Sequence, residues 1–272
     1  MSRNWAIVVI TMLVSPRCFG AKSSQAQDIV ARSVQNMNAD WSAAPQFDFT
    51  ERDVIRKKGR SSVMTYRVLM IGGSPYQRLL AVNGEPLPAA QVAREQGKLQ
   101  REIARRGREM PSARQKRVAE YQKERRQDHE LMAEMVQGFD FKLEGEETLN
   151  GRRCYVLDAT PRPGYQPKSR ETKVLKGMRG KMWIDVQRYQ WVKVQAEVFR
   201  PVTFGLFVAH VQPGTEFTLE QKPVEGNIWL PSHFSMRVKA QILLFSRRST
   251  DDETYSQYRP VSEPPNPHNA KR

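Results

Sequence analysis

The sequence predicts an α+β protein in which about ten antiparallel strands form a strongly curved, unclosed half-barrel. Apolar and polar residues alternate over 139–144 and 232–245, which is typical of strands that bury one face. Asn-Gly pairs at 83–84 and 150–151 indicate tight turns. A twisted sheet of this width curls, and its apolar concave face needs a cover. An N-terminal helix and an inserted helical pair are the elements available for that cover.

The helices are indicated by two kinds of pattern. Asp28 can cap a helix over 28–41, whose apolar residues recur on one side. Residues 89–137 are charged and poor in β-branched side chains, and they predict helices over 89–106 and 112–137. The residues expected on the buried side of the first helix are Val30, Val34, Met37 and Trp41.

Ten strands are expected in total, three before this insert and seven after it. Residues 203–211 are apolar and aromatic, and we interpret 201–213 as an added loop. The predicted strands cover residues 47–56, 62–71, 76–82, 139–144, 152–160, 180–185, 190–199, 215–221, 232–245 and 253–259.

Residues 1–26 are predicted to be a cleavable secretory signal. A basic head containing Arg3 precedes an apolar run over 5–14, which is too short for the ~20 residues that span a bilayer. Cleavage is expected after Gly20 or after Ala26. The signal predicts a periplasmic protein, with the half-barrel domain at 27–260 and a disordered, proline-rich tail at 261–272.

Export changes how the cysteines and the charge are interpreted. Cys18 lies in the signal and leaves Cys154 alone, so the mature chain has no internal disulfide. The whole chain has a formal net charge of +15. Residues 1–26 hold three cations and no acid, so the mature chain has a net charge of +12. Outside the cytoplasm such a charge favours an anionic membrane surface or acidic partners over nucleic acid.

The excess of positive charge is concentrated in the helical insert. Residues 94–126 contain 12 Lys or Arg against 5 Asp or Glu. Either this is a solvated helical hairpin, or it is a basic surface for anionic headgroups or a partner. The side chains proposed for that surface patch are Arg105, Arg106, Arg125 and Arg126.

Signatures of catalysis are missing from the sequence. His129, His210, His233 and His268 have no metal-site spacing, and no nucleophile elbow, P-loop or dinucleotide fingerprint occurs. We therefore expect no enzyme activity, no cofactor and no metal. A hydrolase site assembled from distant residues is kept as a third hypothesis.

The remaining positive feature is apolar surface on long strands. It forms either an ordinary filled core or a cavity for an apolar ligand. The candidate cavity residues are Val192, Val194, Ala196 and Val198 on one strand and Phe234, Met236, Val238 and Ile242 on another.

Three segments resemble one known family. Residues 180–185 (Gly-Lys-Met-Trp-Ile-Asp), 190–193 (Gln-Trp-Val-Lys) and 229–231 (Trp-Leu-Pro), in this order of elements, look like the outer-membrane lipoprotein-sorting (LolA-like) superfamily, which includes LolA and RseB. The resemblance implies an unclosed β-barrel whose concavity holds acyl chains under a helical lid. It also implies a lipid or a lipidated protein as ligand.

The chain also departs from the family pattern. Its insert is longer and more basic, and no functional motif of the family can be matched. We therefore predict a periplasmic lipid or lipoprotein binder, either a carrier or a sensor. The alternative is a non-catalytic envelope interaction module with a filled core.

Overall fold

The computed structural model describes residues 19–57, 59–169, 171–204, 209–242 and 245–261. Most of the predicted signal and nearly all of the predicted tail lie outside these ranges. The first described element is helix α1 (Phe19–Ala43). None of the helices in the described ranges has the length and apolar character needed to cross a membrane.

The centre of the molecule is a single antiparallel sheet that does not close into a barrel, which confirms the predicted fold class. Eleven strands form its main path, in the order β4-β3-β2-β1-β13-β12-β11-β8-β7-β6-β5. The strands are β1 (Phe47–Lys57), β2 (Arg60–Ile71), β3 (Ser74–Val82), β4 (Glu85–Pro86), β5 (Phe139–Leu149), β6 (Arg152–Pro161), β7 (Met178–Asp185), β8 (Trp191–Val198), β9 (Val202–Phe204), β10 (Ala209–Val211), β11 (Glu216–Glu225), β12 (Ile228–Ile242) and β13 (Phe245–Pro260).

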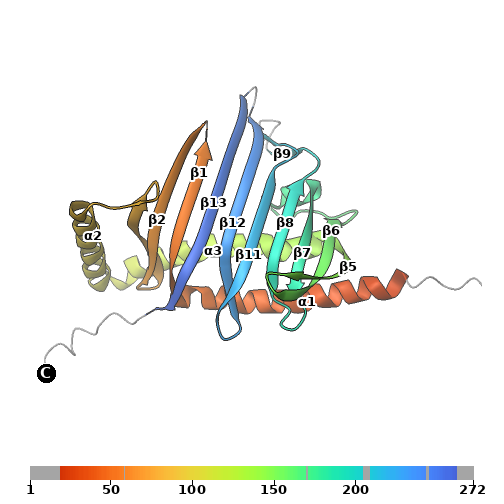
Figure 1. The fold of residues 1–272 in the computed structure, drawn as a ribbon, viewed down its shortest axis with the longest axis horizontal. Helices are drawn as coiled ribbons and strands as arrows, with labels where there is room; N and C mark the ends of the chain where they lie inside the picture. Colours follow the sequence, from red (N-terminus) through yellow and green to blue (C-terminus); the bar gives the residue numbers. More distant parts are fainter. Residues whose placement is uncertain (1–18, 58, 170, 205–208, 243–244, 262–272) are drawn as a thin grey trace, which may run out of the picture.

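The insert connects the two edges of the sheet. Helix α2 (Ala89–Gly107) follows edge strand β4 and packs beside β3, whereas α3 (Pro111–Gly138) leads into the opposite edge strand, β5. Because a helix rises about 1.5 Å per residue, the 28 residues of α3 reach roughly 42 Å. Figure 1 shows α3 running across the sheet and α2 standing at one end of the molecule.

The main core lies where α1 and the C-terminal turns of α3 pack on β5–β8. We call this side of the sheet the inner face. Ile29 and Val30 of α1 are buried there against strand residues such as Leu157 and Ile184. The Trp191 Nε1–H donates a hydrogen bond of 2.9 Å to Ser33 Oγ, so α1 is held by a polar contact as well as by apolar burial.

Helix α1 is longer than the predicted 28–41, and its start bears on the cleavage site. Ala26 is completely buried in the main core. A cut after Gly20 would keep this contact, whereas a cut after Ala26 would remove it. The domain boundaries themselves stay predictions.

The strand predictions were most accurate for the first three strands. The observed β1–β3 agree with the predicted ranges within two residues at each end. β13 starts at Phe245 instead of 253, because its polar first half pairs with β12. The predicted loop at 201–213 contains the short hairpin β9–β10, which pairs with β12.

Candidate functional site

The inner face continues past the helix-covered core onto β11, β12, β13 and β1. Leu219 of β11 is paired with Val194 on one side and with Phe234 on the other. Phe217 is paired in the same way with Ala196 and Met236. Directly paired residues of antiparallel strands share a face, so the apolar surface is continuous across three strands. We call Phe217, Leu219, Phe234 and Met236 the apolar strip.

The apolar strip is less buried than the core beside it. Leu219 is buried, but Phe217, Phe234 and Met236 are only half-buried. Ile55 lies on the same face of β1, one strand beyond β13, and is 45% exposed. The inner face therefore changes from a packed core at β8 to partly uncovered apolar surface at β12 and β1.

The predicted cavity residues are distributed over both faces. Val194 and Ala196 adjoin the apolar strip. Val198, the last residue of β8, packs against Leu175 and Met178. Val192 lies on the other face, in a cluster with Trp183 and Trp229.

A bulge explains the position of Val192. The register between β7 and β8 shifts between Trp183 and Ile184, which places Val192 out of phase with Val194. On β12, Val238 lies on the same face as the apolar strip, because it is two residues from Met236. Ile242 is the last residue of β12, and its side chain is outside the described part of the structure.

A group of acids and tyrosines lies next to the apolar strip on the same face. Phe234 is paired with Glu253 of β13, and Glu253 is paired with Asp53 of β1. Glu51 is paired with Tyr255 on one side and Tyr66 on the other. We call Glu51, Asp53, Glu253, Tyr66 and Tyr255 the carboxylate–tyrosine cluster.

The cluster is held together by few hydrogen bonds. The Tyr255 hydroxyl donates to Glu253 Oε2, and Gln77 Nε2 donates to Glu51 Oε2 at 3.2 Å. Asp53 Oδ1 is buried without a hydrogen-bond partner. Within the described ranges, none of the three carboxylates forms an ion pair with Lys, Arg or His.

This environment favours protonation of the cluster. Burial, and then the nearby charges of Asp53 and Glu253, raise the pKa of Glu51 from 4.5 to about 7. Burial and the charge of Glu253 also raise the pKa of Asp53. Burial raises the pKa of Tyr255 as well, so its hydroxyl remains a donor at neutral pH. The cluster can accept hydrogen bonds or a positive charge, and it shares a face with apolar surface.

The sequence analysis did not identify the cluster, although one signal was present. Phe47 and Phe49 place the odd-numbered residues of β1 on the apolar side, and continuing that alternation assigns Glu51 and Asp53 to the same side. The contribution of β13 was not recognisable, because its pairing with β1 joins residues about two hundred positions apart.

The four predicted patch arginines have different environments. Arg105 is exposed and paired with Glu102, and Arg126 is exposed. Arg125 stacks on the Trp41 ring at 4.4 Å and donates to the Trp41 carbonyl, so it joins α3 to α1. Arg106 donates to the Ile71 and Ser74 carbonyls at 2.8 Å each, so it joins α2 to the β2–β3 turn.

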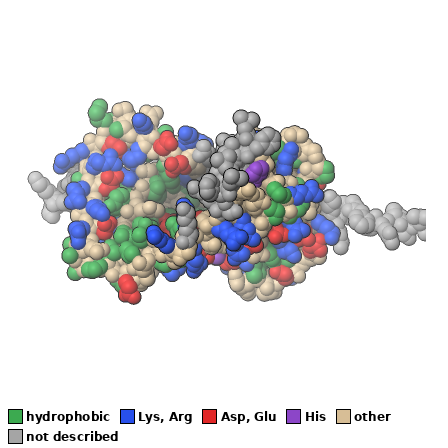
Figure 2. Space-filling model, turned by 90° about the horizontal axis from the view of Figure 1, so that it is seen from above, with side chains coloured by type: hydrophobic (Ala, Val, Ile, Leu, Met, Phe, Trp, Pro, Cys, Tyr) green, Lys and Arg blue, Asp and Glu red, His purple; other side chains and the backbone are tan. Residues whose placement is uncertain are grey.

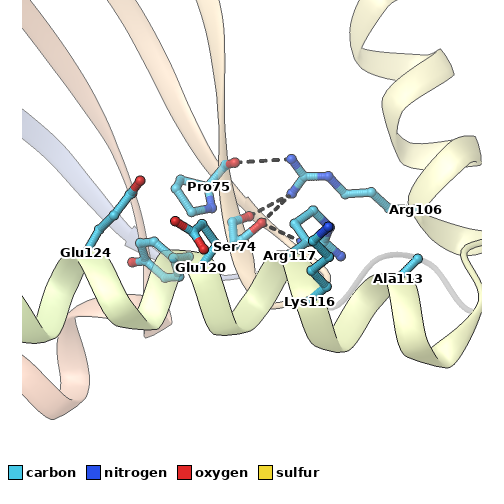
Figure 3. Close-up of a pocket in the computed structure, with 9 residues that line it drawn as sticks. Ser74, Pro75, Arg106, Ala113, Lys116, Arg117, Glu120 and Glu124 are labelled. Atoms are coloured by element: carbon cyan, nitrogen blue, oxygen red, sulfur yellow. Dashed lines mark hydrogen bonds between the residues drawn. The ribbon is translucent and has the colours of Figure 1, made fainter.

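A pocket of about 600 Å³ lies between α3, the end of α2 and this turn. Figure 3 shows Arg106 and Arg117 directed at Ser74 and Pro75, while Lys116, Glu120 and Glu124 project from α3. Arg117 is also bound by Glu109. Both arginines are bound to protein partners, so they hold the insert against the β2–β3 turn.

Charge and apolar surface are mixed on the face seen from above in Figure 2, where Lys and Arg side chains occur on both halves. In the described part of the chain, no three His, Cys, Asp or Glu side chains are grouped so as to hold a metal ion. The features that the described residues place together on the inner face are the apolar strip and the carboxylate–tyrosine cluster at its end.

Several solved structures are similar to this chain at low sequence identity. No family model and no curated protein matches the chain. A DUF1329 family protein from Desulfovibrio piger is similar to it, with 12% identity, coverage of 88% of this chain and 93% of that chain, and a TM-score of 0.35. An outer membrane lipoprotein-sorting protein domain from Vibrio parahaemolyticus has 12% identity, coverage of 87% and 92%, and a TM-score of 0.37.

A LolA superfamily protein from Nitrosomonas europaea is also similar, with 13% identity, coverage of 88% of this chain and 94% of that chain, and a TM-score of 0.29. The likeness concerns the fold alone. The topology itself is the one that the sequence resemblance implied, an open curved antiparallel sheet with an N-terminal helix.

Proposed function

We propose that this protein binds a lipid-like amphiphile, either a free lipid or a lipidated protein, on the inner face of its half-barrel in the periplasm. The observation that carries the proposal is the partly uncovered apolar strip beside a fully packed core. The protein acts as a carrier or a sensor and not as an enzyme.

The apolar strip supplies the attraction for an acyl chain. Phe234 and Met236 are half-buried, and Ile55 is a further exposed apolar side chain on the same face, separated from Met236 by Asp251 of β13. Each methylene group that a ligand removes from water contributes about 0.8 kcal/mol. An acyl chain lying across β11 and β12 would complete the cover that α1 provides over β5–β8.

The carboxylate–tyrosine cluster supplies the selectivity for the polar end of the ligand. It has acceptors in Glu51 and Asp53 and no basic partner within the described ranges. A headgroup with an amine or hydroxyl donor would satisfy Asp53 Oδ1. A second carboxylate would be repelled at neutral pH.

A second function is favoured by the packed half of the inner face. Trp191, Leu157 and Ile184 are completely or almost completely buried without any ligand. If the strip is covered by a partner protein, the molecule is a non-catalytic envelope interaction module with a filled core. A lipid binder should co-purify with lipid, whereas the interaction module should not.

The test uses protein isolated from the periplasm. Lipid extraction and mass spectrometry should show a bound amphiphile, and a fluorescent fatty acid should be displaced by it. Met236→Gln should weaken fatty-acid binding about tenfold, because it places an amide in the apolar strip. Arg237→Gln is the matched control on the opposite face of β12. Absence of both co-purifying lipid and fatty-acid binding would exclude lipid binding and favour the interaction module.

A further inference from the structure

Helix α2 carries a line of cations that neither the core nor the proposed ligand surface uses. Arg94, Lys98, Arg101, Arg105 and Arg108 are spaced at i, i+4, i+7, i+11 and i+14, and all are exposed. With 3.6 residues per turn, this spacing places them within an arc of about 80°. The buried residue Leu99 points to the opposite side, where α2 packs on β3. We call these five residues the cationic stripe.

The protein neutralises only two of the five cations of the cationic stripe. Glu95 and Glu102 lie on the flank nearer to Leu99 and pair with Lys98 and Arg105. Arg94, Arg101 and Arg108 have no carboxylate partner among the residues that the structure describes. Since α2 stands at one end of the molecule (Figure 1), the stripe faces outward over roughly 21 Å.

One exposed apolar side chain lies at the C-terminal end of the stripe. Met110 is 71% exposed and follows Arg108 by two residues, at the junction of α2 and α3. Val92 and Ile103 are also exposed, but with 3.6 residues per turn they fall on the side of α2 away from the stripe. A soluble polyanion would need only the cations. A bilayer surface offers phosphates to the cations and an apolar layer beneath them to Met110.

We propose that α2 docks the protein on an anionic lipid bilayer. The guanidinium groups of the cationic stripe contact headgroup phosphates, and Met110 enters the interfacial layer beside Arg108. Glycine and alanine between the cations, at Gly97 and Ala104, let the helix backbone approach the surface. The docking surface is separate from the apolar strip, so it does not depend on the ligand proposed there.

The experiment is co-sedimentation of the full chain with vesicles of phosphatidylcholine, with or without phosphatidylglycerol. The wild-type chain should bind only the anionic vesicles, and added salt should weaken binding. The triple variant R94Q/R101Q/R108Q should lose about 100-fold in affinity, because each cation near an anionic surface contributes roughly fivefold. The matched control R56Q/K176Q/K222Q removes the same charge from exposed positions elsewhere and should bind like the wild type.

Each alternative outcome overturns the proposal. Equal weakening by the triple variant and its control would mean that only net charge matters. No binding of the wild type to anionic vesicles would remove the docking surface altogether. Met110→Ser should weaken vesicle binding severalfold and leave binding to a soluble polyglutamate unchanged. Tighter binding to polyglutamate than to vesicles would identify an acidic protein as the partner instead.

Discussion

The two halves of the inner face differ in how completely they are packed. Over β5–β8, α1 and the end of α3 bury Trp191 and Leu157 completely. Over β12, β13 and β1, Met236 is half-buried, Ile55 is exposed and carboxylates with raised pKa occupy the same face. The difference indicates that one half supplies most of the apolar burial that stabilises the fold, whereas the other half keeps carboxylates whose burial is unfavourable.

The largest expected effect is in the packed half. Trp191→Ala removes the largest side chain that joins β8 to α1, together with its hydrogen bond to Ser33. The free energy of unfolding should fall by about 3–5 kcal/mol, which urea denaturation would measure. Lys193→Ala, which is half-buried on the other face of β8, should cost far less. Similar losses for the two variants would contradict the assignment of the core to this half.

The connection between the insert and the sheet should show the next largest effect. Arg106→Gln removes a charged donor from the Ile71 and Ser74 carbonyls and leaves Glu102 with one partner fewer. We expect unfolding to become easier by about 2 kcal/mol. Arg105→Gln, one residue away and exposed, should leave stability nearly unchanged. If Arg105→Gln cost as much as Arg106→Gln, Arg106 would have no special structural role.

The carboxylate–tyrosine cluster predicts a pH effect of about 1 kcal/mol. The pKa of Glu51 is about 7 in the folded protein and 4.5 ordinarily, so the native state holds an extra proton between these values. Its contribution is therefore favourable at low pH and is lost as the pH rises from about 4.5 to 7. Because the cluster is partly exposed, solvent screening reduces the effect to on the order of 1 kcal/mol.

Glu51→Gln should flatten this part of the stability profile, as measured by urea denaturation at several pH values. The matched change Glu216→Gln lies on the same sheet, in an exposed ion pair with Arg237. It should leave the slope of the profile unchanged. A slope that persists in Glu51→Gln would show that another group holds the proton.

Local patterns in the sequence were sufficient to predict the fold class, the helices and most of the strands, but not the hairpin β9–β10. The alternation in β12 and the Asn-Gly turns depend on neighbouring residues, and the positive φ of Asn83 and Asn150 agrees with the turns predicted there. Pairing between distant strands was not predictable in this way. β1 and β13 meet in the middle of the sheet, and this contact creates the carboxylate–tyrosine cluster.

The side-chain environments were also not predictable from residue type alone. Arg105 and Arg106 are neighbours with the same charge, but they point to opposite sides of α2, one exposed and the other inward to the β2–β3 turn. The phase of the helix, fixed by the burial of Leu99, separates them. Likewise, the bulge at β7–β8 moved Val192 away from the face that strict alternation assigned to it.

The smallest single effect is expected for Met236→Ala, which is best judged against the same substitution in the packed half. Met182 is 2% exposed in the main core, whereas Met236 is half-buried in the apolar strip. Met182→Ala should cost about 2–5 kcal/mol of unfolding free energy, because it leaves a cavity. Met236→Ala should cost less than about 1 kcal/mol, because its side chain has fewer packed neighbours to lose. Thermal and urea unfolding of both variants measure the difference, and equal costs would mean that the strip is as filled as the core and unsuited to an acyl chain.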